Sequence, residues 1–436
     1  MNREILKIAL PSIVANITIP LLGLLDTAIA GHLGSATFIG AIAVATMMFN
    51  LIYWNFGFLR MSTSGLTAQA YGAADMPRCL RTLWQSCAIA LAIALTIVVL
   101  QVPLLALSMW VISPSADVVA LASDYFRICV WGAPPVLVMM SIKGWLLGMQ
   151  DSKAAMWVSI VVNVLNIIAS LLAVYVMRQG FMGIAVGTLV AEWLGLAYAL
   201  WVVWRKMRRL GLTRLWGRDT RSFVGARRFF SVSGDILLRS FLLMLVNLFV
   251  VAAGARSGDM ILAVNSLMQQ LNSLFAYFLD GIAFAGEALV GKYYGANNGP
   301  RLRLCVRRLF VWAAVLTAAF TVLYSWPQLI FAILTDASDV ITAALDYRWW
   351  CALLPVAGMA AFVWDGVFIG LTRSRGMLLA VAVADAAFFA LYFILPASMG
   401  NHRLWLAFVT YLALRGVVQT WLYARYNPAS ASATLK

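Results

Sequence analysis

The chain has 436 residues, of which 63% are hydrophobic and 11% are charged, and its formal net charge is +15. A typical soluble domain is about half apolar and about a quarter charged, so this composition excludes an ordinary soluble fold. Lipid must surround most of the chain, and only helices or closed barrels satisfy the backbone there. Because the apolar runs reach roughly 20 residues, about twice the length of a barrel strand, we predict an all-α polytopic membrane protein.

Twelve transmembrane helices are predicted. Arg3 and Lys7 precede the first apolar run as in a signal peptide, but Asp26 and two prolines interrupt that run, so we expect an uncleaved first helix. In chain order the predicted spans are 4–30, 36–60, 79–103, 117–148, 154–177, 182–206, 228–253, 259–290, 302–333, 338–370, 376–398 and 403–425.

One connection is longer than the others. It is rich in Arg and is interrupted by Gly211 and Gly217, as expected of a linker. The predicted domains are therefore an N-terminal six-helix lobe at 1–206, a cytoplasmic basic linker at 207–227, a C-terminal six-helix lobe at 228–426 and a cytoplasmic tail at 427–436.

The basic residues predict the orientation. With the N-terminus inside, the predicted outer ends hold only Arg127, Arg178, Arg256, Arg348 and Arg403, and the other assigned bases fall at inner ends. Since cytoplasmic loops are enriched in Lys and Arg, we expect both termini in the cytoplasm. Bases that lie between hydrophobic runs set topology, so we expect no nucleic-acid partner. The five cysteines are scattered and predict neither a disulfide framework nor a metal site.

The two predicted lobes contain similar segments. SGLTAQAYGAADMPR (64–78) lies 223 residues before EALVGKYYGANNGPR (287–301), and GWLLGMQDS (144–152) lies 222 residues before GVFIGLTRS (366–374). Each lobe has an even number of predicted spans, so both copies insert the same way up. This arrangement indicates two parallel six-helix bundles related about an axis along the membrane normal, a common plan of transporters with the pathway between the lobes.

Asp26 is the leading candidate for function, because a charge at the centre of a span costs about 2.5–3.5 kcal/mol on insertion scales. It lies in LLDTAIAGHLG (24–34), near the outer end of the first span. An interfacial acid in contact with outer water is the alternative interpretation. Pro11 and Pro20 lie in the same helix and favour bending, because each removes a backbone donor.

Polar residues of the fifth and sixth spans lie at a similar depth to Asp26. Asn163, Asn166 and Ser170 share one helix face, and Thr188 follows on the next span. With a rise of about 1.5 Å per residue, Asp26, Asn166, Ser170 and Thr188 fall within roughly 6–17 Å of the outer boundary. These oxygen-bearing groups either hold a proton or a hard cation, or they only bond the helices together.

The second lobe has its own acids. Asp280 and Glu287 share a face of the eighth span, and we expect Asp280 to be the deeper and the functional one. Glu287 and Asp365 fall near the inner interface, where a structural role is the alternative. Asp235 is expected to form a local ion pair with Arg239 at i+4. The sequence assigns no role to the remaining mid-span charges, which are Glu192, Asp385 and Arg415.

No enzyme signature is present in the sequence. The two histidines, His32 and His402, fall in outer loops of different lobes, and no HExxH, Walker or nucleophile-elbow motif occurs. An intramembrane enzyme would need a catalytic His, Ser or metal group within the spans, and a receptor would need a soluble signalling domain. We therefore predict a secondary transporter that is not an enzyme, uses no cofactor and draws on an ion gradient.

The motifs together resemble one family. Pro11 precedes LLDTAIAGHLG, and FLRMSTSGLTAQAYGA, GWLLGMQ, NVLNI, GDILLRS, LDGIAFAGEA and DGVFIG follow in that order. With these motifs in this order, the sequence resembles the multidrug and toxic compound extrusion (MATE) family, and within it the DNA-damage-inducible DinF branch, over about residues 5–425. The resemblance implies two six-helix bundles in a V shape that export amphiphilic, often cationic, drugs or toxic metabolites by proton or sodium antiport. We expect a monomer in the bilayer of a bacterial inner membrane.

The resemblance also implies roles for single residues. It places Asp26, Asn166 and Thr188 in a cation-linked site, with Asn163 and Ser170 nearby, and it implies that the first helix bends when Asp26 is protonated. The family pattern after NVLNI often continues to an aspartate, where this chain has Ser170. One carboxylate fewer weakens sodium binding, so we expect proton coupling. A flippase for lipid-linked precursors is the alternative function, but a groove lined with Arg would favour it and the bases here cluster in loops.

Overall fold

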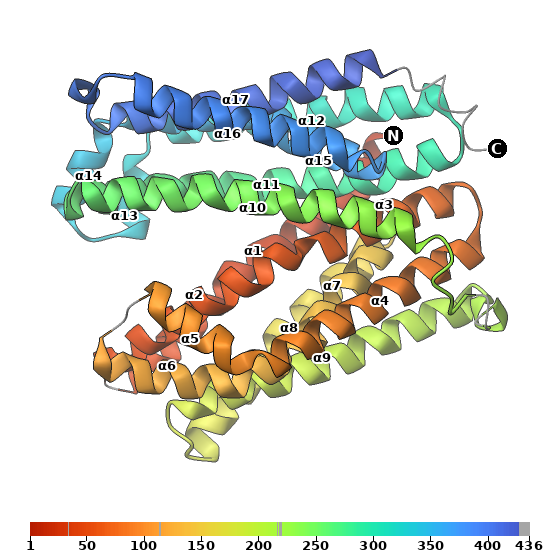
Figure 1. The fold of residues 1–436 in the computed structure, drawn as a ribbon, viewed down its shortest axis with the longest axis horizontal. Helices are drawn as coiled ribbons and strands as arrows, with labels where there is room; N and C mark the ends of the chain where they lie inside the picture. Colours follow the sequence, from red (N-terminus) through yellow and green to blue (C-terminus); the bar gives the residue numbers. More distant parts are fainter. Residues whose placement is uncertain (34, 113–114, 216, 218–219, 427–436) are drawn as a thin grey trace. The chain divides into compact units, whose positions relative to one another are not determined.

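The computed structural model describes residues 1–33, 35–112, 115–215, 217 and 220–426. All regular elements in this part of the chain are helices, and it contains no strand (Figure 1). The prediction of an all-α chain is confirmed. The predicted tail, 427–436, lies outside the described residues.

The chain divides into two compact units. Val14–Phe229 form one unit, here named the N lobe, and Met1–Ile13 together with the chain from Phe230 onward form the other, here named the C lobe. Helix α1 (Asn2–His32) therefore begins in the C lobe and continues in the N lobe. The sequence-based division assigned residues 1–13 to the N-terminal lobe, so the two divisions differ there.

The contacts of residues 1–13 explain why they belong to the C lobe. Gly281 lies against Ala9 and Ile13, where an added Cβ would come within 3.0 Å of the Ala9 carbonyl oxygen. The Tyr293 hydroxyl donates a hydrogen bond to Glu4 Oε1 over 3.0 Å. These contacts fix the first turns of α1 to the helix that carries Gly281 and Tyr293.

The N lobe contains the rest of α1 and the α-helices α2 to α9. Short 3₁₀ or π segments lie between or after some of these helices. Their bounds are α2 (Ala36–Tyr53), η1 (Trp54–Gly57), α3 (Phe58–Gly72), α4 (Met76–Val99), α5 (Gln101–Ile112), α6 (Ala116–Cys129), η2 (Val130–Gly132), α7 (Ala133–Gly148), α8 (Ser152–Leu171), η3 (Leu172–Val176), α9 (Met182–Arg209) and η4 (Leu212–Leu215).

The described part of the C lobe continues with five long helices, α10, α11, α12, α15 and α17, the helix α16, and two short helices, α13 and α14; the long helices run side by side in Figure 1. Their bounds are α10 (Ala226–Arg256), α11 (Asp259–Gly295), α12 (Gly299–Ser325), α13 (Gln328–Leu334), α14 (Ser338–Leu345), α15 (Arg348–Gly370), α16 (Ser374–Ile394), η5 (Ala397–Met399) and α17 (His402–Arg425).

Most predicted spans correspond to these helices, but α3 continues to Gly72, beyond the predicted span 36–60, and α5 lies mostly outside the predicted spans. Ten described stretches are long and apolar enough to cross a membrane by length and composition. The first and last predicted spans are helical as well, as α1 and α17, but are not among the ten. The predicted spans 36–60 and 117–148 are each interrupted by a 3₁₀ segment, η1 and η2, and the π segment η3 ends the span that α8 begins.

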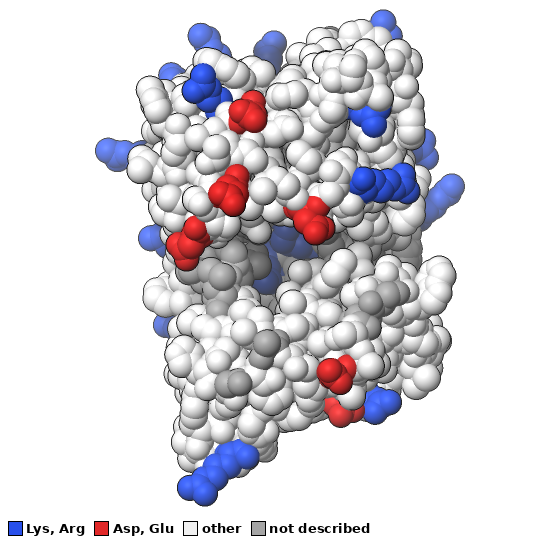
Figure 2. Space-filling model, turned by 90° about the vertical axis from the view of Figure 1, so that its left-hand side faces the viewer, with Lys and Arg blue, Asp and Glu red and all other residues white. Residues whose placement is uncertain are grey.

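The surface is consistent with lipid as the solvent. Many large apolar side chains are exposed, among them Val99, Trp110, Ile333 and Ile394, each at 78% or more. Figure 2 shows one end of the molecule, where isolated charged side chains stand among uncharged surface. Apolar side chains so exposed are stable where lipid covers them, as expected for membrane spans.

The repeated sequence segments adopt the same backbone. After α3, Ala74 has a φ of +58°, and Asp75 accepts a hydrogen bond from the backbone N–H three residues on, at 3.0 Å. After α11, Asn297 has a φ of +53°, and Asn298 accepts the corresponding bond at 3.1 Å. The second pair of segments also matches, with Gln150 and Thr372 at positive φ. Four of the five described non-glycine residues with positive φ thus lie in the repeated loops.

The repeat extends to helix packing. Gly144 of α7 lies against the Arg60 carbonyl of α3, and Gly366 of α15 lies against the Ala283 carbonyl of α11. A Cβ at either glycine would collide with that carbonyl oxygen. Small residues allow helix backbones to approach closely in membranes, and here the two lobes use them at the same place.

Candidate functional site

Asp26 lies six residues before the end of α1, about 9 Å along the helix from its C-terminal end. Its Oδ1 atom is buried and has no hydrogen-bond partner among the described residues. A buried polar atom without a partner costs about 1–3 kcal/mol, and more when it is charged. The interpretation of Asp26 as a surface acid is therefore disfavoured, at least for this atom.

Asn166 and Thr188 are joined directly. Asn166 Nδ2 donates to Thr188 Oγ1 over 3.0 Å, and Thr188 Oγ1 donates to the Ile184 carbonyl of its own helix over 3.0 Å. Asn166 is 2% exposed. The bond connects α8 with α9, and it leaves Asn166 Oδ1 buried without a partner in the described chain.

Ser170 lies one turn further along α8. It is fully buried, and its Oγ atom has no partner among the described residues. Gly187 of α9 packs directly on its backbone and on Oγ, where a Cβ would collide. The close crossing at Gly187 holds Ser170 against α9, next to Thr188. Three buried oxygens of the N lobe, on Asp26, Asn166 and Ser170, thus lack protein donors in this part of the structure.

Asn163 connects α8 to α1. Its Nδ2 atom donates to the Thr18 carbonyl over 3.2 Å. Thr18 lies two residues before Pro20, and Pro20 has no N–H to donate to the Asn16 carbonyl. Asn163 therefore lies beside the weakened stretch of α1 and not next to Asp26. Its contact makes it a residue that holds α1 in position.

Pro11 and Pro20 both lie inside α1, which is helical through both of them. Pro11 is buried and Pro20 is exposed. The hydroxyls of Thr18 and Thr27 donate to carbonyls three and four residues earlier, at 2.7 and 2.8 Å. Such bonds within the helix favour bending, as the two prolines do.

Tyr125 of α6 is a member of this region that sequence reasoning missed. Its hydroxyl is within hydrogen-bonding reach of Thr188 and within electrostatic range of Asp26. Its ring packs on Phe181 with centroids 5.9 Å apart. Nothing in the local sequence separates Tyr125 from Phe126 beside it, so only the fold identifies it.

In the C lobe, Asp365 lies at the centre of a buried ion-pair network. Its Oδ2 accepts hydrogen bonds from Arg239 of α10 and from Arg415 of α17, the latter over 3.0 Å, and its Oδ1 accepts from Gln419 over 2.7 Å. The residue is 8% exposed. Two guanidinium groups and an amide satisfy this carboxylate, so no place remains on it for a coupling cation.

The network corrects the predicted Asp235–Arg239 pair. Arg239 bonds Asp365, and Asp235 instead accepts from the Ser374 hydroxyl over 2.6 Å. The i+4 spacing allowed a local pair, but a buried guanidinium gains more from a carboxylate inside the lobe than from one at its edge. The prediction of the local pair is wrong.

The remaining acids of the C lobe lie elsewhere. Asp385 of α16 is buried, its two oxygens have no hydrogen-bond partner among the described residues, and Arg415 is its nearby cation. Glu287 is 1% exposed on α11, where its carbonyl meets Gly370 of α15. Asp280, on the same helix, is half-buried with Tyr277 nearby. The structure thus brings Asp365 and Asp385 to one arginine and places Asp280 and Glu287 on another helix.

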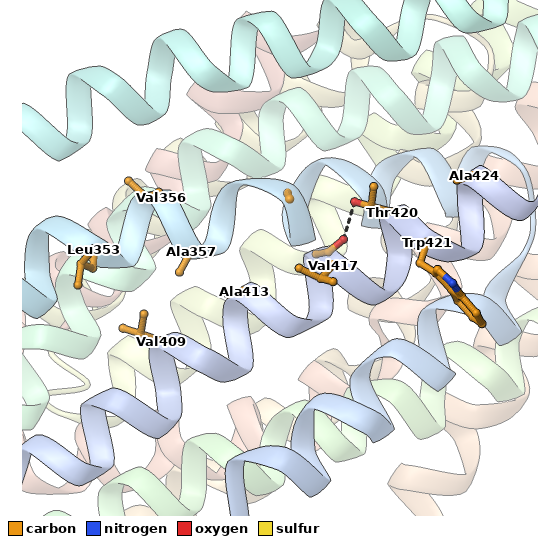
Figure 3. A pocket seen from close by; sticks show the side chains of 11 residues that line it. Leu353, Val356, Ala357, Val409, Ala413, Val417, Thr420, Trp421 and Ala424 are labelled. Atoms are coloured by element: carbon orange, nitrogen blue, oxygen red, sulfur yellow. Dashed lines mark hydrogen bonds between the residues drawn. The ribbon is translucent and has the colours of Figure 1, made fainter. Parts of the chain in front are cut away.

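A groove of about 640 Å³ lies in the C lobe between α15 and α17 (Figure 3). Its lining is apolar except for Thr420, whose hydroxyl donates to the Gly416 carbonyl over 2.7 Å. No lining residue is titratable. The groove is suited to an apolar chain and is unsuited to hold a coupling cation.

Comparison with known families gives a match over both lobes. The family model named MatE matches residues 11–172 and 236–392, which is more than half of the chain. The chain belongs to the MATE family. The two matched segments fall one in each half of the chain, as the repeat requires. MATE proteins are transporters, so the prediction of a transporter and not an enzyme is confirmed.

Relatives with printed descriptions agree with MATE membership. The DNA damage-inducible protein F of Escherichia coli (strain K12) is 36% identical over 98% of this chain and 92% of its own length. A probable multidrug resistance protein NorM of Rhizobium meliloti (strain 1021) is 26% identical over 97% of this chain and 93% of its own. The resemblance to the DinF branch is confirmed, and these bacterial relatives indicate a multi-pass protein of the inner membrane.

Solved MATE structures have the same fold. A crystal structure of MATE in the straight conformation has a TM-score of 0.84 at 19% identity and covers 97% of this chain and 95% of that one. A structure described as the bent conformation has a TM-score of 0.84 at 18% identity, over 99% and 96%. At this identity the similarity shows the fold, which is the predicted twelve-helix MATE fold.

Proposed function

We propose that this MATE protein exports amphiphilic or cationic small molecules in exchange for protons, with Asp26 as the coupling acid. The supporting observation is the set of three buried oxygens without donors, on Asp26, Asn166 and Ser170. An ionised carboxylate in such a place is costly unless a cation or a proton joins it. The two natural partners of the Asp26 carboxylate are a proton and the positive charge of the cargo. Because they compete for the same carboxylate, the binding of one releases the other, which is the basis of antiport.

Protons fit this site better than sodium. The N-lobe oxygens near Asp26 come from an amide and from hydroxyls, with one carboxylate among Asp26, Asn166, Ser170 and Thr188. Hard cations are held by several oxygens that include carboxylates, whereas a proton needs one carboxylate. In the C lobe the buried acid Asp365 is already neutralised by Arg239 and Arg415.

The first helix provides the conformational response. When Asp26 is ionised, cargo is favoured. When a proton from outside neutralises Asp26, cargo is released, and α1 bends at the stretch weakened by Pro11 and Pro20. During this change the Asn166–Thr188 bond keeps α8 against α9. The bond from Asn163 to the Thr18 carbonyl keeps α8 against α1. Both termini are cytoplasmic in this scheme, as the basic loops indicate.

Reconstituted vesicles test the coupling ion. The purified protein is placed in liposomes loaded with radiolabelled tetraphenylphosphonium, and a proton gradient or a sodium gradient is imposed separately. We expect protein-dependent efflux with the proton gradient alone and none with sodium alone. Efflux driven only by sodium would contradict proton coupling, and no efflux of any amphiphilic cation would contradict the proposed cargo class.

Substitution of Pro20 tests the bending. Pro20 is exposed, so Pro20→Ala restores a backbone donor at little cost in packing. We expect the Ala variant to keep its thermal stability and to lose proton-driven efflux. Ala substituted for Leu10, an exposed residue of the same helix, is the control. Full efflux in Pro20→Ala would remove the helix bend from the mechanism.

A further inference from the structure

A second buried carboxyl of the N lobe has no role in the scheme above. Glu192 of α9 has a buried Oε2 atom without a hydrogen-bond partner among the described residues. It lies ten residues from the start of α9, about 15 Å along the helix, which is close to the middle of a hydrocarbon core about 30 Å thick. An acid at that depth is a functional candidate by default.

The position of Glu192 connects it with the coupling site. Thr188 lies one turn before it on α9, so the two side chains share a helix face. Cys129 of α6 lies within electrostatic range of both Glu192 and Asp26, and its thiol donates to the Ala185 carbonyl of α9 over 3.6 Å. Glu192 and Asp26 are therefore both near this thiol, and Glu192 lies further along its helix from the nearest helix end than Asp26 does.

Two helix interruptions lie near Glu192. Gly132, the last residue of η2, lies directly against the carboxyl: a Cβ there would overlap Oε2 and lie 2.8 Å from Cδ. Tyr53, which precedes η1, is within electrostatic range of Glu192, and its buried hydroxyl also lacks a partner in the described chain. Phe49 stacks on Phe126 at 5.2 Å and so holds this end of α2 against α6. Short 3₁₀ stretches inside long helices often mark functional hinges.

The surroundings of Glu192 contain titratable groups but no salt-bridge partner among the described residues. Its titratable neighbours are Tyr53 on α2 and Cys129 on α6, and the same Cys129 is also within electrostatic range of Asp26 on α1. Lys206 pairs with Asp151 at the other end of α9, over 2.6 Å. Among the described residues no cation forms a salt bridge with Glu192, so an ionised Glu192 would be a buried charge without compensation, and neutralisation by a proton removes that cost.

We propose that Glu192 is a second proton-binding group of the N lobe, so that the protein exchanges two protons, one on Asp26 and one on Glu192, for each monovalent cation exported. Each carboxyl takes its proton from outer water and releases it to inner water. This inference rests on the proton antiport proposed above. Helix α8 contains no acid, and Glu192 supplies the second carboxyl from α9, which packs against α8.

The proton count per cation tests this directly. Vesicles are used with the membrane potential clamped at zero by potassium and valinomycin. At each of several ratios of inner to outer tetraphenylphosphonium concentration, we would measure the pH difference at which the protein-dependent flux of this cation reverses. The logarithm of the cation ratio plotted against that pH difference has a slope equal to the number of protons exchanged. We expect a slope of about two for the wild type and of about one for Glu192→Gln.

The outcomes separate the two proposals. A wild-type slope of one, or an unchanged slope in Glu192→Gln, overturns the role of Glu192 and leaves proton antiport in place. A wild-type flux that does not respond to the pH difference overturns the proposed function itself. Because the slope is an equilibrium quantity, a variant that is merely slow or partly unfolded does not change it.

A glycine substitution tests the same contact without removal of the carboxyl. Gly132→Ala displaces the flexible end of Glu192, whereas Gly57→Ala, in the other interruption, meets no atom within 4 Å. We expect Gly132→Ala to shift the pH of half-maximal efflux by about 0.5 unit or more, because the carboxyl changes its surroundings, and Gly57→Ala to match the wild type. Identical pH profiles for both variants count against the proposal.

Discussion

Arg415 Nη2 lies 3.0 Å from Asp365 Oδ2 in the interior of the C lobe, and Arg239 bonds the same oxygen from another helix. This pair joins α17 to α15 and neutralises the acid that the sequence analysis considered as a possible site in the second lobe. Asp365 is therefore satisfied by its partners, whereas the carboxyls of Asp385 in the C lobe and of Asp26 in the N lobe have buried oxygens without a hydrogen-bond partner among the described residues.

Removal of this carboxylate should destabilise the protein. Asp365→Asn leaves two buried guanidinium groups with one acid, Asp385, nearby, and loss of one partner of a buried ion pair costs about 3–5 kcal/mol. We expect a clearly lower thermal unfolding midpoint in detergent. Asp259→Asn, at an exposed acid of the same lobe, is the matched control and should unfold like the wild type. An Asp365→Asn protein of full stability that has lost coupling would instead assign Asp365 to transport.

Thr188 should affect transport and not folding alone. Thr188→Val removes the acceptor of Asn166 Nδ2 and the nearby partner of Tyr125. We expect proton-driven efflux to slow by about tenfold, which corresponds to roughly 1.4 kcal/mol. Thr96→Val, which removes an exposed hydroxyl bonded to its own helix at 3.0 Å, should leave efflux unchanged. Equal rates in the two variants would mean that the Asn166–Thr188 bond has no part in coupling.

The repeated helix crossings should be equally sensitive in the two lobes. Gly144→Ala and Gly366→Ala each drive a methyl group into a backbone carbonyl, and overpacking of this kind costs about 1–3 kcal/mol. Thermal unfolding of both variants should shift downward by similar amounts. Gly23→Ala, where no atom lies within 4 Å, is the control. A neutral result at either crossing would show that the packing is not shared between the lobes.

The repeated turns allow a stabilising change. Ala74 has a φ of +58°, which costs a residue with a Cβ about 1–2 kcal/mol, so Ala74→Gly should raise the unfolding midpoint. Asn297 occupies the same position in the other lobe at +53°, and Asn tolerates this conformation, so Asn297→Gly should change little. Stabilisation by both substitutions, or by neither, would disagree with this account of the turns.

Much of the architecture could be predicted because membrane solvent restricts the backbone to a few solutions. Runs of apolar residues predicted most of the helices, but α3 extends twelve residues beyond the predicted span 36–60 and α5 was not predicted. The two copies of the Gly-Ala turn predicted turns that share positive φ values at Ala74 and Asn297. The interruptions at η1 and η2 were not predicted, although Gly57 lies in the first and Gly132, Pro134 and Pro135 lie in or directly after the second. Glycine and proline are the usual local signals of such breaks.

The contacts of the candidate site could be predicted from the sequence only in part. Spacing along one helix indicated that Asn166 and Ser170 share a face, and depth placed Thr188 beside them, as the Asn166–Thr188 bond requires. Spacing also suggested the Asp235–Arg239 pair, which the structure replaces with Arg239–Asp365 between residues 126 positions apart. Partners on distant helices, such as Tyr125 and Gly132, carry no signal in the sequence. Their roles follow only from the packing of α6, η2 and α9.

The central claim is that Asp26 gains and loses a proton as cargo crosses. The most direct test compares wild type, Asp26→Asn and Asp26→Glu in vesicles with an imposed pH difference, with tetraphenylphosphonium flux as the readout. The account predicts that Asp26→Asn binds or exchanges cargo without response to the pH difference, and that Asp26→Glu restores part of the response. An Asp26→Asn protein that drives cargo against its gradient as well as the wild type does would contradict it.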